Sequence, residues 1–265
     1  MQVETGMLAN PLMQRFLDYS IGRLTLPGLD YLNERAATLR IVTGSSLPLR
    51  FALPDQGADY ELQAYQSGVV ATRPNNWHDA LNALVWLNFP QSKAALNSSH
   101  IAARERVVGA RTHRGKARDA LTQFDECGVI VAGTSYKLWQ ALAGHQWTDV
   151  FVTRRSELLA TTRFIVFGHG SLDALRAPFV GLCGKAVFLP TDDAGLAAID
   201  DGDLHKVDNA VARRVVSTNT LTEPVLRLQP LPLLGIPGAT EKNECAAYYQ
   251  DVRQFRPRRI LAGER

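Results

Sequence analysis

The sequence contains few cysteines and no long hydrophobic run. Three cysteines stand far apart among 265 residues, and no two of them form a CxxC pair. Neither a disulfide framework nor a zinc knuckle is therefore expected. No apolar run approaches the roughly 18 residues that a membrane span needs, and the start of the chain lacks the basic and apolar stretches of a secretory signal. These absences predict a cytoplasmic protein with no membrane partner.

Standard catalytic and nucleotide-binding motifs are also absent. The sequence has no HExxH zinc motif and no GxGxxG loop. Residues 181–185 depart from the spacing of a phosphate-binding P-loop and lack its final serine or threonine. Residues 168–172 do not form the GxSxG turn that presents a nucleophilic serine. No reaction follows from a short motif alone.

The composition is that of a folded protein. Hydrophobic residues make up 46%, charged residues 21%, and the mean hydropathy is -0.11, which is too apolar for a disordered chain. Because helical patterns outweigh strand patterns and do not alternate regularly with them, we predict the α+β class. We expect a mainly helical single domain over residues 1–265 with a small sheet of short strands. Apolar spacing indicates helices at 77–89, 92–106 and 114–124 and strands at 129–132, 161–167 and 186–188.

Two further segments carry weaker patterns. Residues 60–66 follow the turn-forming residues 54–57 and look like a short extended segment. The end of the chain, from Leu226, is rich in proline and is expected to wrap the surface.

Charge is unevenly distributed along the chain. Residues 103–118 hold six arginines or lysines against one glutamate, and residues 191–208 hold six aspartates against one lysine. The basic segment is either an anion-attracting loop or a solvated face paired with the acidic segment. It has no aromatic residue and the sequence pI is about 8.8, so nucleic acid is not an expected partner. An anionic small molecule is the expected partner, and the oligomeric state is not predicted.

A predicted apolar helix carries the first polar candidates. Asn76 follows Pro74 and is a good helix N-cap, which places Asp79 where a carboxylate meets free amides. His78 and Asn82 lie four residues apart and share one face of this helix. Because the rest of the helix is apolar nearly all round, both should be buried and should need partners. They are either core hydrogen-bonding groups or a polar pocket wall.

The next predicted helix carries a polar stripe. Lys93, Asn97, His100 and Arg104 recur at the spacing of one helical face. The stripe contains two cations, a histidine and an amide but no acid. That combination favours an anionic ligand over an ordinary solvated face.

Two acids and one histidine complete the candidates. Asp125 and Glu126 come at the end of a predicted helix, where carboxylates oppose the helix dipole, and such local conflicts are typical of functional positions. His169 stands between Gly168 and Gly170 directly after a predicted strand. Active-site residues often occupy this kind of loop, so His169 is the strongest candidate among the histidines.

Several of these segments resemble one bacterial family. PNNWHDALNALVWLNFPQSKAALNSSH at 74–100 is similar to the signature of the family called domain of unknown function 3025. TQFDECG at 122–128, FGHG at 167–170 and PLLGIPG at 232–238 match its other landmarks, over about residues 10–260. The resemblance implies membership without an activity, and it leads us to expect alanine where Gly170 stands. The positions it carries over are Asn76, Trp77, His78, Asp79, Asn82, Lys93, Asn97, His100, Asp125, Glu126 and His169.

The candidate residues fit two main functional hypotheses, besides a metal-free enzyme in which His169 or His78 acts as acid or base while Lys93 and Arg118 bind substrate. In the first, the protein is a metal-dependent hydrolase that uses zinc or manganese on a phosphorylated or other anionic substrate. In the second, it is a non-catalytic ligand-binding or scaffold protein in which the same groups form a buried polar network. Convergence of the histidines in one cleft would favour the first. Its expected metal ligands are His78, His100, His169 and Asp79; its catalytic residues are Glu126 as general base, His169 and Asp125; and its substrate-binding residues are Lys93, Asn97, Arg104, Arg118 and Asn82.

Overall fold

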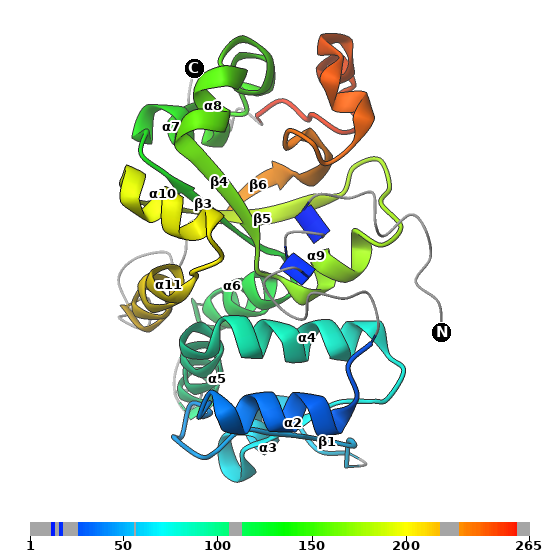
Figure 1. The fold of residues 1–265 in the computed structure, drawn as a ribbon, viewed down its shortest axis with the longest axis vertical. Helices are drawn as coiled ribbons and strands as arrows, with labels where there is room; N and C mark the ends of the chain where they lie inside the picture. Colours follow the sequence, from blue (N-terminus) through cyan, green and yellow to red (C-terminus); the bar gives the residue numbers. More distant parts are fainter. Residues whose placement is uncertain are drawn as a thin grey trace.

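A four-stranded mixed sheet lies at the centre of the structure (Figure 1). The computed structural model describes residues 12–13, 16–17, 26–55, 57–105, 113–217 and 228–258. The strand order is β4-β3-β5-β6, with β3 and β5 parallel and the two outer pairs antiparallel. All residues of β3 are buried, as expected of a central strand covered on both faces. The strands are β3 (Gly128–Gly133), β4 (Thr162–Val166), β5 (Cys183–Pro190) and β6 (Gln229–Pro232).

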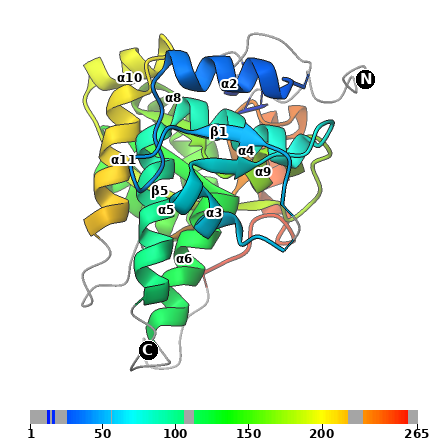
Figure 2. The same cartoon turned by 90° about the horizontal axis from the view of Figure 1, so that it is seen from below.

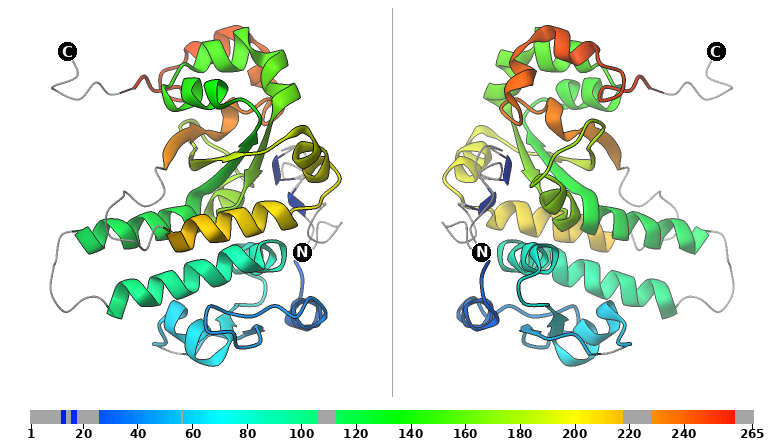
Figure 3. Two further views of the ribbon diagram at one scale, coloured as in Figure 1. Left: turned by 90° about the vertical axis from the view of Figure 1, so that its left-hand side faces the viewer. Right: turned by 90° about the vertical axis from the view of Figure 1, so that its right-hand side faces the viewer.

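Helices pack on the sheet from one end and form a layer of their own below it. Helix α4 contacts α9, α6 contacts both α5 and α9, and α11 packs along α5. In Figures 2 and 3 the long helices α5, α6 and α11 run close together and project beyond the sheet. The helices of this group are α4 (Trp77–Asn88), α5 (Pro90–Glu105), α6 (His113–Cys127), α9 (His169–Ala174) and α11 (His205–Ser217).

The remaining elements close the two ends. A small parallel strand pair, β1 with β2, lies with α2 and α3 at the lower end of Figure 1. At the upper end, α7, a short π-helix and α8 lie near the C-terminal segment. These elements are α2 (Leu29–Thr38), β1 (Arg50–Ala52), α3 (Tyr60–Ser67), β2 (Val69–Ala71), α7 (Tyr136–Ala143), the π-helix Asp149–Thr153, α8 (Arg155–Thr161) and α10 (Asp193–Asp200).

The predicted fold class is confirmed. The described residues form a helix-rich α+β structure with two small sheets, and the buried apolar side chains form one large connected cluster. Within the described parts of the chain, no helix has both the length and the apolar character needed to cross a membrane. The extent of the domain over residues 1–265 stays a prediction.

Three local predictions were wrong. His78, which was expected to be buried, has a side chain that is 39% exposed. Residues 60–66 belong to helix α3, because the Asp59 side chain accepts a hydrogen bond from the Leu62 amide and Gly68 ends the helix at a φ of +74°. The proline-rich end does not simply wrap the surface. Its strand β6 pairs with β5, and Leu233 and Phe255 are buried in the core.

The start of helix α5 is held by a buried carboxylate from α11. Asp208 accepts hydrogen bonds from the amides of Gln91 and Ser92 at 2.9 and 2.8 Å and from the Ser92 hydroxyl at 2.6 Å. These amides belong to the first turn of α5, where no intrahelical acceptor exists. Asp208 therefore fixes the helix that carries the polar stripe.

Replacing this cap should destabilise the protein. Asp208→Ala leaves buried donors unpaired, so we expect the free energy of unfolding to fall by about 1–3 kcal/mol. Urea denaturation followed by circular dichroism measures the loss. Asp193→Ala, at an exposed aspartate, is the control and should change stability by less than about 0.5 kcal/mol. Equal effects of the two substitutions would contradict the capping role.

Candidate metal centre

A polar cavity of about 530 Å³ lies where α3, α4, α5, α6 and α9 meet. His78, His100 and His169 all line it, which is the convergence that the hydrolase hypothesis requires. Its volume lies within the range typical of small-molecule sites. The lining residues are Pro54, Tyr60, Glu61, Ala71, Arg73, His78, Asp79, Asn82, His100, Arg118, Thr122, Asp125, Glu126 and His169.

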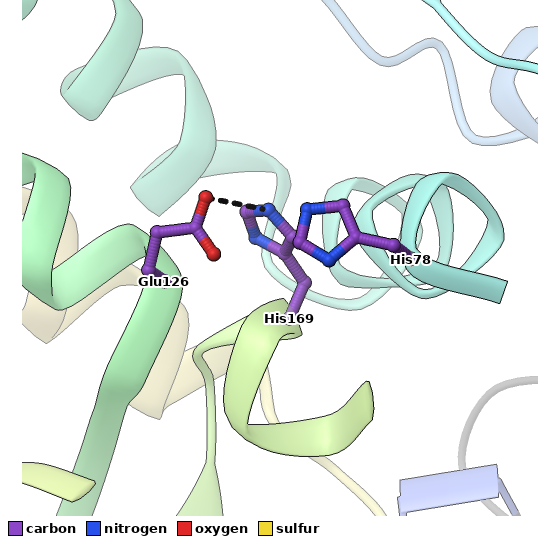
Figure 4. A group of neighbouring side chains, drawn as sticks. All are labelled: His78, Glu126 and His169. Atoms are coloured by element: carbon purple, nitrogen blue, oxygen red, sulfur yellow. Dashed lines mark ion pairs between the residues drawn. The ribbon is translucent and has the colours of Figure 1, made fainter. Parts of the chain in front are cut away.

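Three side chains from three helices meet at one wall of this cavity. His78, Glu126 and His169 each offer a ligand atom, and these atoms all lie within 4.8 Å of one another. Nε2 of His169 lies 3.4 Å from Oε1 of Glu126, and the two imidazole rings are 4.6 Å apart at an angle of 67°. Figure 4 shows the three side chains pointing toward one another. Two imidazoles and a carboxylate are a common ligand set for zinc and other transition metals.

The glycines around His169 permit this approach. A Cβ at Gly168 would lie 2.4 to 2.5 Å from backbone atoms of residues 126–128, so only glycine fits there. A Cβ at Gly170 would lie 2.5 Å from Oε2 of Glu126. The FGHG pattern therefore allows the first turn of α9 to pack directly on the end of α6, which brings His169 beside Glu126.

A buried ion pair stands behind His169. Nζ of Lys93 lies 2.5 Å from Oδ1 of Asp125, and the two residues are only 2% and 8% exposed. The other carboxylate oxygen of Asp125 lies 3.8 Å from Nδ1 of His169. That nitrogen is buried and has no hydrogen-bond partner among the described residues. A carboxylate behind the non-ligating nitrogen of an imidazole is the usual outer partner of a metal-bound histidine.

The environment keeps both acids ionised. Burial raises the pKa of Asp125, but the charges of Lys93 and His169 lower it by more, so it lies below its ordinary value. The hydrogen bond from His169 holds the pKa of Glu126 below its ordinary value despite partial burial. Both carboxylates are therefore available as anions at neutral pH.

Asp79 and His100 lie in the same cavity but outside this group of three. The Asp79 carboxylate accepts two hydrogen bonds from the Arg73 guanidinium, at 2.8 and 2.9 Å. Its amide donates to Asn76 Oδ1, as expected of an N-capped helix. Nε2 of His100 lies 4.0 Å from Oε1 of Glu61. Asp79 therefore faces an arginine and His100 faces a glutamate, and neither belongs to the group of His78, Glu126 and His169.

The predicted substrate-binding stripe is paired with acids from other elements. Lys93 is bound to Asp125, and Arg104 lies 2.6 Å from Asp59. Asn97 donates to the side chain of Glu61 at 2.7 Å and to its backbone oxygen at 2.9 Å. The stripe contains no acid of its own, so these pairings explain its composition without a ligand.

Two predicted substrate-binding residues remain in contact with the cavity. Arg118 lines it, and no ion pair of Arg118 is found among the described residues. Asn82 also lines it and donates to the hydroxyl of Tyr60 at 2.8 Å. The basic segment at 103–118 falls partly outside the described residues, since 106–112 are not among them.

Sequence reasoning missed several residues of the cavity wall. Tyr60 and Glu61 lie on α3, the helix that was taken for an extended segment. Arg73 also lines the cavity and is paired with Asp79. Asp173 is not a lining residue, but its carboxylate oxygen lies 3.8 Å from Nδ1 of His78. The Asp59 N-cap was the one local signal that pointed to α3 and thus to Glu61.

The geometry thus defines a candidate site for a single divalent metal ion at the wall of a polar cavity. The chain belongs to the family described as "Protein of unknown function (DUF3025)", whose sequence profile matches residues 49–259. This match agrees with the resemblance seen in the sequence. No curated protein and no solved structure matches the chain. The family description itself assigns no activity, so function has to be argued from the site.

Proposed function

We propose that the protein is a metal-dependent hydrolase in which His78, Glu126 and His169 hold one zinc or manganese ion. The observation that carries this proposal is the 4.8 Å grouping of their ligand atoms beside an open cavity. Ligand atoms of one such ion lie roughly 3 to 4 Å apart, so small side-chain rotations complete the set. Three protein ligands leave a position for water, as in catalytic rather than structural sites.

The surrounding residues have supporting roles in this proposal. Asp125, fixed by Lys93, lies 3.8 Å from Nδ1 of His169, so a small shift of the imidazole on metal binding would let Asp125 accept the Nδ1 proton and leave Nε2 facing Glu126 and the ion. Glu126 acts as a ligand instead of the general base that the sequence suggested. A bound ion would supply a water of lowered pKa. In the net reaction, the water oxygen bonds to the phosphorus or carbonyl carbon, the bond to the leaving group breaks, and the leaving group takes a proton.

The cavity charges limit the kind of anionic substrate. Two cations line the cavity, Arg73 and Arg118. Arg73 is paired with Asp79 at 2.8 Å, so Arg118 is the one left, among the described residues, to hold an anionic group. One such contact favours a singly charged group over a fully ionised phosphate, which usually takes several donors.

Metal analysis of purified, untagged protein tests the proposal. After loading with zinc or manganese and desalting, wild type should retain about one ion per chain, and His169→Ala less than a tenth of that, because three ligands are needed for stable binding. His100→Ala should retain the ion, which separates this ligand set from the one expected from sequence. His205→Ala, at an exposed histidine on α11, is the matched control. Wild-type protein that retains neither zinc nor manganese after this treatment would overturn the proposal.

The complete pairing of the stripe supports a second candidate function. If Lys93, Asn97 and Arg104 serve only to join α5 to α3 and α6, the protein is a non-catalytic ligand-binding or scaffold protein. That function requires that wild type hydrolyse neither p-nitrophenyl phosphate nor p-nitrophenyl acetate, with or without added metal. Metal-dependent turnover of either compound, abolished by His169→Ala, would exclude it.

A further inference from the structure

The hydroxyl of Tyr60 has a proton to give. It accepts hydrogen bonds from Nδ2 of Asn82 at 2.8 Å and from Nε1 of Trp86 at 3.2 Å. An amide nitrogen and an indole nitrogen are donors only, so both occupy lone pairs of the hydroxyl oxygen. No acceptor for the Tyr60 proton occurs among the residues that the structure describes. Because Tyr60 lines the cavity, a ligand there can accept that proton.

The same pair has an acceptor to offer. Asn82 is 6% exposed, and its Oδ1 is buried with no hydrogen-bond partner among the described residues. A buried carbonyl oxygen without a partner costs free energy and is rare in folded proteins. Asn82 also lines the cavity, but Oδ1 itself exposes less than 1 Å², so a ligand N–H group would satisfy it after a small rotation of the amide toward the cavity. Nδ2 of the same side-chain amide donates to the Tyr60 hydroxyl, so Oδ1 and that hydroxyl are separated only by the amide group of Asn82.

Burial keeps the tyrosine a donor. It raises the pKa of Tyr60 to about 12, even though the charge of Lys93 acts in the opposite direction. The hydroxyl is therefore protonated throughout the neutral range. The acceptor on Asn82 does not titrate at all.

The pair lies close to the candidate metal group. Asn82 follows His78 by four residues on the same face of α4, about one helical turn or 5.4 Å further along. A ligand that reaches from Asn82 to His78 along this helix would place its polar group at Tyr60 and Asn82. The bond to be hydrolysed would then lie near His78. The two subsites are therefore within reach of one small molecule.

We propose that Tyr60 and Asn82 recognise an amide whose carbonyl oxygen and N–H lie side by side, as in primary carboxamides, lactams and ureides. The Tyr60 hydroxyl donates to the carbonyl oxygen, and Oδ1 of Asn82 accepts the N–H. Ionised phosphate and carboxylate groups and esters offer only acceptors to this pair of residues. One of their oxygens would therefore face Oδ1 of Asn82 with no proton between the two. This inference rests on the proposed function for the identity of the site, and it narrows the substrate to an anionic molecule that contains such an amide.

A matched pair of ligands tests the recognition directly. 2-Pyrrolidone and γ-butyrolactone have the same ring and carbonyl group, but the lactone has oxygen in place of the N–H. Titrations of chelator-treated protein, followed by ligand NMR signals, give both dissociation constants without turnover. We expect the lactam to bind about tenfold more tightly, because the lactone leaves Oδ1 of Asn82 unpaired.

Variants then assign the preference to the two side chains. Tyr60→Phe and Asn82→Leu should each reduce the ratio of the two dissociation constants to near one. Tyr136→Phe, at an exposed tyrosine outside the cavity, is the control and should keep the wild-type ratio. If one site variant does not fold, the other one tests the assignment.

The outcomes separate this inference from the proposed function. Equal binding of the two ligands to wild type, or no binding of either, overturns the amide subsite whatever the metal content. A lactam preference in a protein that retains no metal supports the subsite and overturns the hydrolase proposal. Retention of the preference in both Tyr60→Phe and Asn82→Leu overturns the assignment to these residues.

Discussion

Lys93→Met should lower the free energy of unfolding by about 3–5 kcal/mol, the cost of leaving a buried charge without its partner. The side chains of Lys93 and Asp125 are 3% and 11% exposed, with 2.5 Å between nitrogen and oxygen. Methionine is similar in length to lysine but leaves the buried Asp125 carboxylate without its charged partner. Urea denaturation at pH 7 measures the effect, and Lys206→Met at an exposed lysine is the control.

A double substitution distinguishes charge from packing. Lys93→Met with Asp125→Leu removes both charges, and we expect it to recover most of the loss, since well-packed apolar replacements of buried ion pairs are often neutral. A double variant as unstable as the single one would show that side-chain packing, and not the unpaired charge, carries the effect.

The destabilisation should depend on pH in a defined way. The pKa of Asp125 is lowered in the folded protein, so its contribution is present above the ordinary carboxyl pKa and is lost as pH falls through the folded pKa. The pKa of Lys93 is raised although burial opposes this, so its contribution is present below the ordinary lysine pKa and is lost as pH rises through the folded pKa. The difference between wild type and Lys93→Met should therefore be largest near neutral pH and should shrink as pH falls through the carboxyl range and as it rises through the lysine range.

Alanine at the two glycines beside His169 should have two different effects. At Gly168 the new Cβ would meet backbone atoms at 2.4 to 2.5 Å, so the end of α6 must move, and we expect a loss of about 2–3 kcal/mol in stability. At Gly170 the closest atom is Oε2 of Glu126 at 2.5 Å, the end of a flexible side chain, and one backbone oxygen, that of Glu126, lies at 2.9 Å and must shift slightly. Gly170→Ala should therefore displace the carboxylate and weaken zinc binding by about 10–100-fold, with a smaller loss in stability.

Zinc titration against a chelator and urea denaturation of both variants check this contrast. Family resemblance led us to expect alanine at position 170, so the comparison also asks what this glycine contributes. Wild-type zinc affinity in a folded Gly170→Ala protein would show that Glu126 does not bind the ion in the position seen here.

The sequence predicted the elements whose signals are local. The N-cap at Asn76 and the apolar pattern after it predicted α4, and the position of His169 between two glycines after a predicted strand marked it as the strongest candidate among the histidines. Helix α3 was missed because its eight residues carry only one buried side chain, Ala64, and short helices have little periodicity to detect. Its N-cap Asp59 was the remaining signal.

The site itself was only partly predictable. His78, Glu126 and His169 were all singled out, but nothing in the sequence shows that α4, α6 and α9 meet. The sequence predicts Asp79 as a ligand, whereas its carboxylate is bound by Arg73 just before the helix. The lysine and arginine of the stripe pair with an acid on α6 and with the N-cap residue of α3. Such pairings are set by tertiary packing, and one sequence without its relatives does not reveal them.

The unequal exposure of the three proposed ligands has a kinetic consequence. The side chain of His169 is 5% exposed, whereas those of His78 and Glu126 are 39% and 42% exposed. The buried His169 would thus hold a fixed position, whereas the side chains of His78 and Glu126 would rotate between the ion and the solvent. Side-chain rotation in exposed residues is fast compared with unfolding. An ion held here would therefore exchange with a chelator from the solvent side while the fold stays closed around His169.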